Sequence, residues 1–436
     1  MYYKMSFYNS AITTHLIDPV YNSANQRSEW RLTSPDSLYL SNLRLLNVGV
    51  RKTISEGETK YNELVGAYGC IRRIQLLDGS VQLDALNNVP EWLAFRNYAK
   101  PNTDNVNMNT ELVKNSLGFV FEGLDISGGF ARLDVYPPSG QVTHLETTTK
   151  TSWLSLKDIL PFLSASLHLS TATFKNLRLV IEWETDKTKL VSMVDNELTT
   201  IQPVLVADEM NDSPTKMKLM KDFKGVNYVT IETDRVVVPS VPGVRLITPN
   251  PEQRIRYLVQ GFNNKKVNRM LIVKTPTVST SWLNGNVEFA TRVYGKVASL
   301  GMVEEAHQFT VNGSSLYPGE GVTKYNQCLA RLQDAWGVTT QPCGYAIFHN
   351  GIGDLFADAE EKMAHTSYIG ANLFGERIRE LQFTYARKGQ YDADYADTDA
   401  AQSVQQYNQQ LILNMFAEVQ RVLIVQPNGS YTVSYV

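Results

Sequence analysis

The sequence has few residues of the kinds that form metal sites or disulfide frameworks. Its 436 residues include 3 cysteines and 6 histidines, and neither set has the spacing of a zinc site. The cysteines are odd in number, and we expect them to be buried free thiols: Cys70, Cys328 and Cys343. The histidines are scattered along the chain: His15, His144, His168, His307, His349 and His365. The sequence therefore predicts no metal site and no cofactor.

Charge is also sparse. Charged residues make up 19% of the chain, the formal net charge is -3 and the pI is about 6.1. Nucleic-acid-binding proteins usually carry a concentrated basic face, so we expect no sequence-specific nucleic-acid binding. The lysines of residues 216–224 are not interleaved with aromatic residues, and we interpret them as a solvated linker surface.

No segment has the composition of a membrane span or a secretory signal. Residues 159–174 form the least charged long run, which is too short and too rich in Ser and Thr to cross a bilayer. The first ten residues, MYYKMSFYNS, contain no basic segment followed by an apolar one. We therefore expect the protein to be made without a signal peptide.

Motifs for catalysis are scarce, with neither a Walker-type loop nor a GxSxG elbow in the sequence. One acidic pair is a possible exception, because Glu182 and Glu184 lie two positions apart on an expected strand and would point to the same face. Paired carboxylates of this kind act in glycosidases. Trp183 would face the other side, no third acid follows closely, and we predict no catalytic residue.

An acidic run, YDADYADTDA, occupies residues 391–400 and contains Asp392, Asp394, Asp397 and Asp399. Four carboxylates could hold calcium, but the run fails the EF-hand pattern. Glycine is absent at the sixth position, and Ser403 stands where the bidentate glutamate belongs. We interpret this run as a solvated loop that precedes a helix.

The chain is too long for one ordinary hydrophobic core, since single cores stop growing near about 250–300 residues. Hydrophobic residues make up 43% of it, which suits a well-packed globular protein. We therefore expect two domains.

A hairpin followed by a helix organises the first half. In residues 70–98 the apolar residues alternate, break at Asp78-Gly79, and alternate again, which is typical of two strands joined by a tight turn. Pro90 then begins a helical pattern. The same arrangement returns 234 positions later, around Asn312-Gly313, and its helix ends at Gly337. This recurrence predicts a tandem pair of similar domains.

The remaining patterns are mostly those of short strands. Strands are expected near residues 43–50, 117–124, 131–136, 177–184, 226–238, 255–260, 269–274, 287–293, 344–349 and 378–385, with a hairpin at the C-terminus. Helical spacing indicates helices at residues 155–163 and 401–418. The weakly patterned residues 1–29 are interpreted as an arm that lies on a neighbour or on the body of the protein.

These patterns predict an all-β fold of two tandem eight-stranded jelly-roll sandwiches with a few short helices in the connections. The expected divisions are an N-terminal arm at residues 1–29, a first jelly roll at 30–208, a linker at 209–225 and a second jelly roll at 226–436.

The order of features resembles the double jelly-roll major capsid proteins of double-stranded DNA viruses. Four stretches carry the resemblance: SEWRLTSPDSLYLSNLRL (28–45), IQLLDGSVQLDALNNVPEWLAF (74–95), LSLKDILPFLSASLHLSTATFKNLRLVIEWE (154–184) and SYIGANLFGERIRELQFTYAR (367–387). The family implies a homotrimer whose six jelly rolls make a pseudo-hexameric tile of an icosahedral shell. It also implies minor capsid or vertex proteins as further partners and the virion as the location.

The sequence thus predicts a structural capsid protein that is not an enzyme. Two alternatives stay open at this point. One is a vertex or attachment protein with a sandwich fold that binds glycans or a receptor. The other is a carbohydrate-active enzyme that uses Glu182 or Glu184.

Overall fold

The structure is a computed structural model of the whole chain. The part of the chain that it describes comprises residues 3–5, 12–23, 26–33, 39–46, 48, 66–98, 154–165, 169–185, 203–239, 253–276, 303–319, 321–323, 325–337, 368–389 and 410–436. The chain forms two compact units. Unit 1 comprises Met1–Leu93, Thr103–Ile231 and Gln420–Val436, and unit 2 comprises Ala94–Asn102 and Glu232–Val419.

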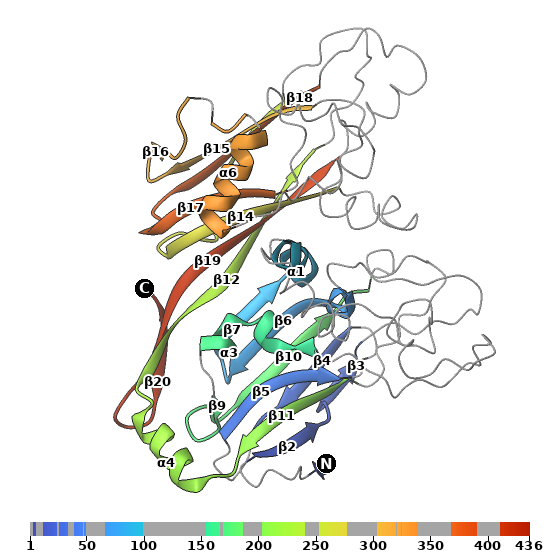
Figure 1. Cartoon of the computed structure of the whole chain (residues 1–436), viewed down its shortest axis with the longest axis vertical. Helices are drawn as coiled ribbons and strands as arrows, with labels where there is room; N and C mark the ends of the chain where they lie inside the picture. The colour runs from blue at the N-terminus through green and yellow to red at the C-terminus, as the bar shows by residue number, and fades with distance from the viewer. Residues whose placement is uncertain are drawn as a thin grey trace, which may run out of the picture. The chain divides into compact units, whose positions relative to one another are not determined.

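Unit 1 contains two antiparallel sheets (Figure 1). One has the order β1 (Tyr3–Met5), β2 (Ile12–Ile17), β11 (Val204–Met210), β5 (Tyr39–Leu46) and β8 (Leu154–Ser155), with β9 (Leu169–Ser170) also paired to β5. The other has the order β3 (Tyr21–Ser23), β4 (Arg27–Arg31), β10 (Leu177–Trp183), β6 (Ile71–Asp78) and β7 (Val81–Asn87). Apolar residues on the inward faces form the core, among them the fully buried Trp30, Leu76, Leu179 and Ile181.

A second pair of sheets is built mainly from unit 2. One has the order β12 (Gly225–Val238), β19 (Leu411–Val425), β14 (Lys266–Pro276) and β17 (Tyr368–Arg377), with β20 (Tyr431–Tyr435) paired to β19. The other has the order β13 (Gln253–Leu258), β18 (Leu381–Gly389), β15 (Val303–Val311) and β16 (Ser314–Ser315). The rings of Phe309 and Phe383 meet in its core with centroids 5.0 Å apart.

The two pairs of sheets repeat one topology. In unit 1 the eight principal strands are β2, β4, β5, β6, β7, β8, β10 and β11, and the second set is β12 to β19. We number the strands of each set from 1 to 8 in chain order. In both sets one sheet then has the order 1-8-3-6 and the other has the order 2-7-4-5. Two four-stranded sheets with these crossovers form a jelly roll. The tandem jelly-roll prediction is confirmed.

The two organising hairpins are also confirmed, and each joins the fourth and fifth strands of its jelly roll. Gly79 has φ 59°, and in the second hairpin Asn312 and Gly313 have φ 51° and 85°. Positive φ at these positions is what a two-residue hairpin turn requires. A helix follows each hairpin: α1 (Val89–Tyr98) in the first and α6 (Tyr325–Trp336) in the second.

The prediction of an arm at residues 1–29 is wrong where the structure describes these residues. Strands β2 and β3 and most of β4 lie in the two sheets of unit 1. The sequence hides them because buried polar residues interrupt the apolar alternation, with Thr13 4% and Ser28 0% exposed. The buried hydroxyl of Ser28 makes two hydrogen bonds: it accepts from Nε1 of Trp183 at 2.8 Å and donates to Asn22 at 2.6 Å. These bonds offset the cost of removing the hydroxyl from water.

The predicted helix at residues 401–418 is wrong from Leu411 onward, since β19 begins there and runs to Val425. Residues 401–409 lie outside the described residues. Seven consecutive residues of this strand, from Leu411 to Ala417, include six that are buried, on both sheet faces. A strand buried on both sides shows no period of two, so its apolar run matched helical spacing by coincidence.

The short helix expected at residues 155–163 is split into the 3-10 turn η4 (Leu156–Asp158) and α3 (Pro161–Ala165). Within the stretch predicted as a linker lies α4 (Ser213–Asp222), and its lysines Lys218 and Lys221 are exposed. The units differ from the predicted domains at the C-terminus, because Gln420–Val436 belongs to unit 1. The strands predicted at 117–124, 131–136, 287–293 and 344–349 lie outside the described residues.

Candidate interaction surface

The outer face of the sheet that contains β4 carries a cluster of charged side chains. Along β4, Ser28 and Trp30 point inward and are 0% exposed, while Arg27, Glu29 and Arg31 alternate with them on the outer face. The residue pattern RSEWR therefore gives one strand an apolar inner side and a charged outer side.

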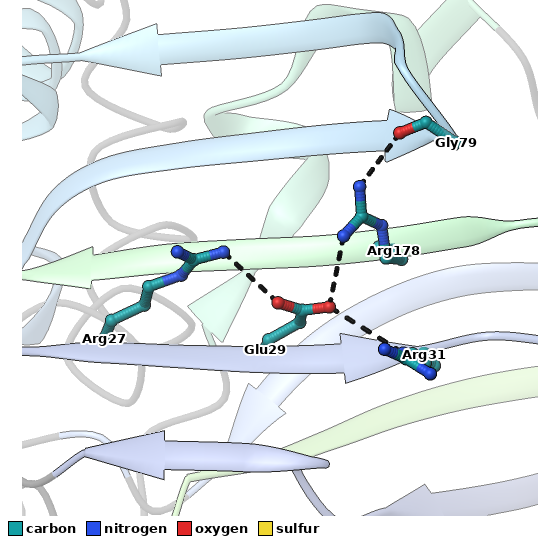
Figure 2. A network of polar contacts seen from close by, with 5 residues as sticks. All are labelled: Arg27, Glu29, Arg31, Gly79 and Arg178. Atoms are coloured by element: carbon teal, nitrogen blue, oxygen red, sulfur yellow. Dashed lines mark hydrogen bonds and ion pairs between the residues drawn. The ribbon is translucent and has the colours of Figure 1, made fainter.

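Glu29 is the centre of this cluster (Figure 2). Its carboxylate lies 3.2 Å from the guanidinium of Arg27, 3.4 Å from that of Arg178 and 3.8 Å from that of Arg31. Arg178 comes from the neighbouring strand β10 and also donates to the carbonyl of Gly79 at 2.9 Å. One carboxylate is thus shared by three guanidinium groups.

The cluster continues across the sheet. Glu182 of β10 accepts from Arg73 of β6 at 3.4 Å, and Gln75 of β6 donates to Gln82 of β7 at 3.3 Å. On the other side, Tyr21 of β3 pairs directly with Glu29 and is 54% exposed. We call this outer face, from β3 to β7, the arginine surface.

The ion pairs of the arginine surface leave an excess of positive charge. They join four arginines to two glutamates, so two positive charges are not balanced within these pairs. The side chains of Arg27 and Arg31 remain 48% and 61% exposed, whereas that of Glu29 is only 12% exposed. Each guanidinium has five N–H donors, so these two arginines keep donors that can bind a carboxylate or a phosphate.

The arginine surface combines four arginines with an exposed tyrosine, Tyr21. Arginine and tyrosine are enriched at the energetically important positions of interfaces. The strands beneath hold these side chains on a rigid base, because Trp183 bonds Ser28 across β10 and β4. Val180, which lies among the charged residues on this face, is only 2% exposed.

A second polar cluster is buried inside unit 1 and is centred on Asp84 of β7. Its side chain is 0% exposed and accepts three hydrogen bonds: from the hydroxyl of Thr230 at 2.6 Å, from the N–H of Phe162 at 2.8 Å and from the N–H of Ala85 at 2.9 Å. Burial raises the pKa of Asp84 to about 7, although the three hydrogen bonds and the charge of Arg421 act in the opposite direction.

Arg421 of β19 lies in the same cluster. It donates to the backbone carbonyls of Leu83 and Gln82, both at 3.0 Å, and its guanidinium lies 4.9 Å from the ring centroid of Tyr435. The hydroxyl of Tyr228 also donates to the carbonyl of Leu83, at 2.7 Å. This cluster therefore joins β7 to residues of α3, β12 and β19.

The two glutamates of the predicted acidic pair lie in different surroundings. Glu182 is on β10 and is ion-paired with Arg73. Glu184 follows the end of β10 at Trp183 and accepts from the N–H of Thr185 at 3.0 Å. Only the first carboxylate of the pair therefore lies on a strand.

Two of the three cysteines are described. Cys70 and Cys328 are buried and form no disulfide, as predicted. Among the histidines, His15 contacts Glu209 at 2.7 Å and His307 is buried. In the described part of the chain, no group of three or more His, Cys, Asp or Glu side chains could hold a metal ion. The remaining candidate residues of the sequence analysis lie outside the described part of the chain: Cys343, His144, His168, His349, His365, Asp392, Asp394, Asp397 and Asp399.

The sequence contains a signal for both clusters. The charged residues Arg27, Glu29 and Arg31 alternate with Ser28 and Trp30, which is a period of two in a segment interpreted as an arm. Asp84 interrupts an apolar strand, at LDAL. A charged residue inside an apolar strand is unusual and needs buried partners.

No helix in the described part of the chain is long and apolar enough to cross a membrane. No protein-family model matches the sequence, and no curated protein matches it either.

Solved structures do share the fold. The structure of PBCV-1 VP54 fitted into a reconstruction of the virophage Sputnik has a TM-score of 0.55 and 10% sequence identity, and the match covers 100% of this chain and 99% of that one. A quasi-atomic model of the PBCV-1 virus capsid has a TM-score of 0.54 and 11% identity, again over 100% and 99% of the two chains. The resemblance to double jelly-roll capsid proteins is therefore confirmed at the level of the fold.

Proposed function

We propose that this protein is a structural subunit of a viral capsid, which assembles with copies of itself. The observation that carries this proposal is the duplicated 1-8-3-6 and 2-7-4-5 topology. It is supported by the similarity of the fold to a capsid structure, which covers 100% of this chain and 99% of that one. A sandwich of hydrogen-bonded sheets suits a protein whose task is to build a shell, because assembly needs stable surfaces rather than a reactive group.

The finer proposal follows the same fold. We expect a homotrimer in which six jelly rolls form a pseudo-hexameric tile, with tiles joined into an icosahedral shell and located in the virion. Minor capsid or vertex proteins are expected as further partners. An obligate interface of this kind would bury about 2,000 Å² or more between subunits.

The protein is not expected to act as an enzyme. This expectation is supported by the ion pair between Glu182 and Arg73, because Glu182 is the member of the acidic pair that lies on a strand. It is further supported by the structural role of Asp84, the described carboxyl group whose pKa is raised most clearly, because three hydrogen bonds and full burial hold it inside unit 1.

Sedimentation velocity with light scattering on the purified full-length chain tests this function. A stable trimer that forms larger closed particles would support it, and negative-stain images should then show tiles with pseudo-sixfold symmetry. A stable pentamer would favour a vertex protein instead. A chain that stays monomeric at high concentration would contradict the proposal.

A further inference from the structure

The arginine surface has positive charge that its own ion pairs do not balance. Arg27 and Arg31 share one carboxylate with Arg178, yet their side chains are 48% and 61% exposed. A surface of this kind binds a partner that supplies carboxylates or phosphates, since the guanidinium fork matches both groups.

The sequence contains a complementary segment, residues 391–400, which we call the acidic segment. It carries Asp392, Asp394, Asp397 and Asp399, and no Lys or Arg occurs between Lys388 and Arg421. The acidic segment also contains two tyrosines, Tyr391 and Tyr395. Carboxylates and aromatic side chains together are what a surface of arginines and an exposed tyrosine can bind.

The acidic segment lies in the connection between two strands of the second jelly roll. Strand β18 ends at Gly389 and β19 begins at Leu411, and these strands belong to different sheets.

We infer that the arginine surface of one copy binds the acidic segment of a second copy. This inference rests on the proposed self-assembly and names a contact that would carry it. Attraction between the two charged surfaces raises the rate of encounter and fixes the register of the subunits, and it excludes contacts between two like surfaces.

Charge reversal on each side of the contact tests the inference. Arg27→Glu with Arg31→Glu is expected to weaken association of the full-length chain by about tenfold or more. Asp392→Lys with Asp394→Lys, and separately Asp397→Lys with Asp399→Lys, should show which end of the acidic segment makes the contact. The decisive variant combines both sides, and it should regain most of the lost association.

The second jelly roll provides a matched control. Arg254 and Arg256 are exposed on β13, which is the second strand of its jelly roll, as β4 is of the first. Arg254→Glu with Arg256→Glu makes the same change in charge on an equivalent strand and should leave association within about twofold of wild type. Circular dichroism and a melting curve verify that each variant is folded.

The outcomes separate the inference from the proposed function. If the wild-type chain does not self-associate, the proposed function fails. If it does, the inference is wrong when the arginine variant assembles as well as wild type, when the control loses as much, or when the combined variant is not restored. It is also wrong if the arginine variant mainly loses affinity for a double-stranded DNA probe, since the surface would then be a phosphate site. Should the arginine variant not fold, the acidic-segment variants give the same test from the other side.

Discussion

The hydroxyl of Thr230 donates a 2.6 Å hydrogen bond to Oδ1 of Asp84, and both side chains are buried inside unit 1. This bond joins β12 to the hairpin strand β7. Because the carboxyl group is fully buried, its protonation is coupled to the stability of the fold.

The first prediction concerns pH. The pKa of Asp84 is raised from 3.8 to about 7 by burial, so between these values the folded chain keeps a proton that the unfolded chain has lost. The contribution of Asp84 to stability is therefore greatest below about pH 4 and is lost as the pH rises to about 7, by up to about 4 kcal/mol. Melting temperatures of wild type and Asp84→Asn at several pH values measure it.

The asparagine variant removes this titration. It has a constant cost, because the amide nitrogen cannot accept the N–H of Phe162. Other carboxylates titrate equally in both proteins, so the difference between them isolates Asp84. We expect wild type to lose about 3 kcal/mol relative to Asp84→Asn between about pH 5 and about pH 8. A difference that stays constant over this range would show that Asp84 is not protonated in the fold.

The second prediction concerns Arg421, which donates to the carbonyls of Gln82 and Leu83. Arg421→Met leaves buried polar groups with fewer partners and should lower the free energy of unfolding by about 2–4 kcal/mol, measured by urea denaturation. Arg421→Lys keeps the charge but not the fork of donors, and we expect it to recover only part of the loss.

The same variant tests the electrostatic coupling to Asp84. The charge of Arg421 lowers the pKa of Asp84, so Arg421→Met should move the pH-dependent loss of stability to higher pH. Arg421→Lys should move it less. A pH profile identical to that of wild type would mean that the guanidinium acts only through its hydrogen bonds.

The sequence predicted those parts of the fold that local chemistry determines. Asp78-Gly79 and Asn312-Gly313 mark hairpins because few other pairs adopt the required φ angles, and Pro90 and Gly337 mark helix ends for a similar reason. The recurrence of these signals led to the tandem jelly roll, which the strand order confirms.

The errors have a common physical cause, which is long-range burial. The strands near Thr13 and Ser28 are buried by pairing with β10 and β11, far away in the sequence, and nothing local indicates it. The strand from Leu411 is buried on both faces, so its pattern shows no alternation. The arginine surface was missed because Arg178 and Glu29 are 149 positions apart.

The third prediction compares two phenylalanines of unit 2. Phe95 of α1 is 2% exposed and packs on Tyr368 and Trp336, with ring centroids 5.2 and 5.6 Å away. Phe374 of β17 is 75% exposed. Phe95→Ala should cost about 3–5 kcal/mol of stability, since it opens a cavity among aromatic rings.

The matched control is Phe374→Ala, which makes the same chemical change at an exposed site and should change stability by less than about 1 kcal/mol. Thermal melts of both variants, followed by near-ultraviolet circular dichroism, give the comparison. Equal losses would mean that Phe95 is not part of the core of unit 2.

The fourth prediction concerns the electrostatics of the arginine surface. Glu29→Gln keeps the shape of the side chain but removes the charge that Arg27, Arg31 and Arg178 share. The three guanidinium groups then repel one another, and stability should fall by about 1 kcal/mol at an ionic strength of about 0.01 M. At about 1 M salt the loss should nearly disappear, because screening weakens the repulsion.

Glu182→Gln is the control, since Glu182 neutralises a single arginine, Arg73, and both side chains are more than a third exposed. An exposed pair of this kind is worth a few tenths of a kcal/mol, so even its complete screening by salt changes stability by no more than that. Glu29 is paired with three arginines and Glu182 with one. A loss of stability that is larger and more salt-sensitive for Glu29→Gln would therefore identify Glu29 as the group that holds the arginines together. Equal losses at low salt would mean that the arginines are already separated by solvent, and their charge would then be too dispersed to bind an acidic partner.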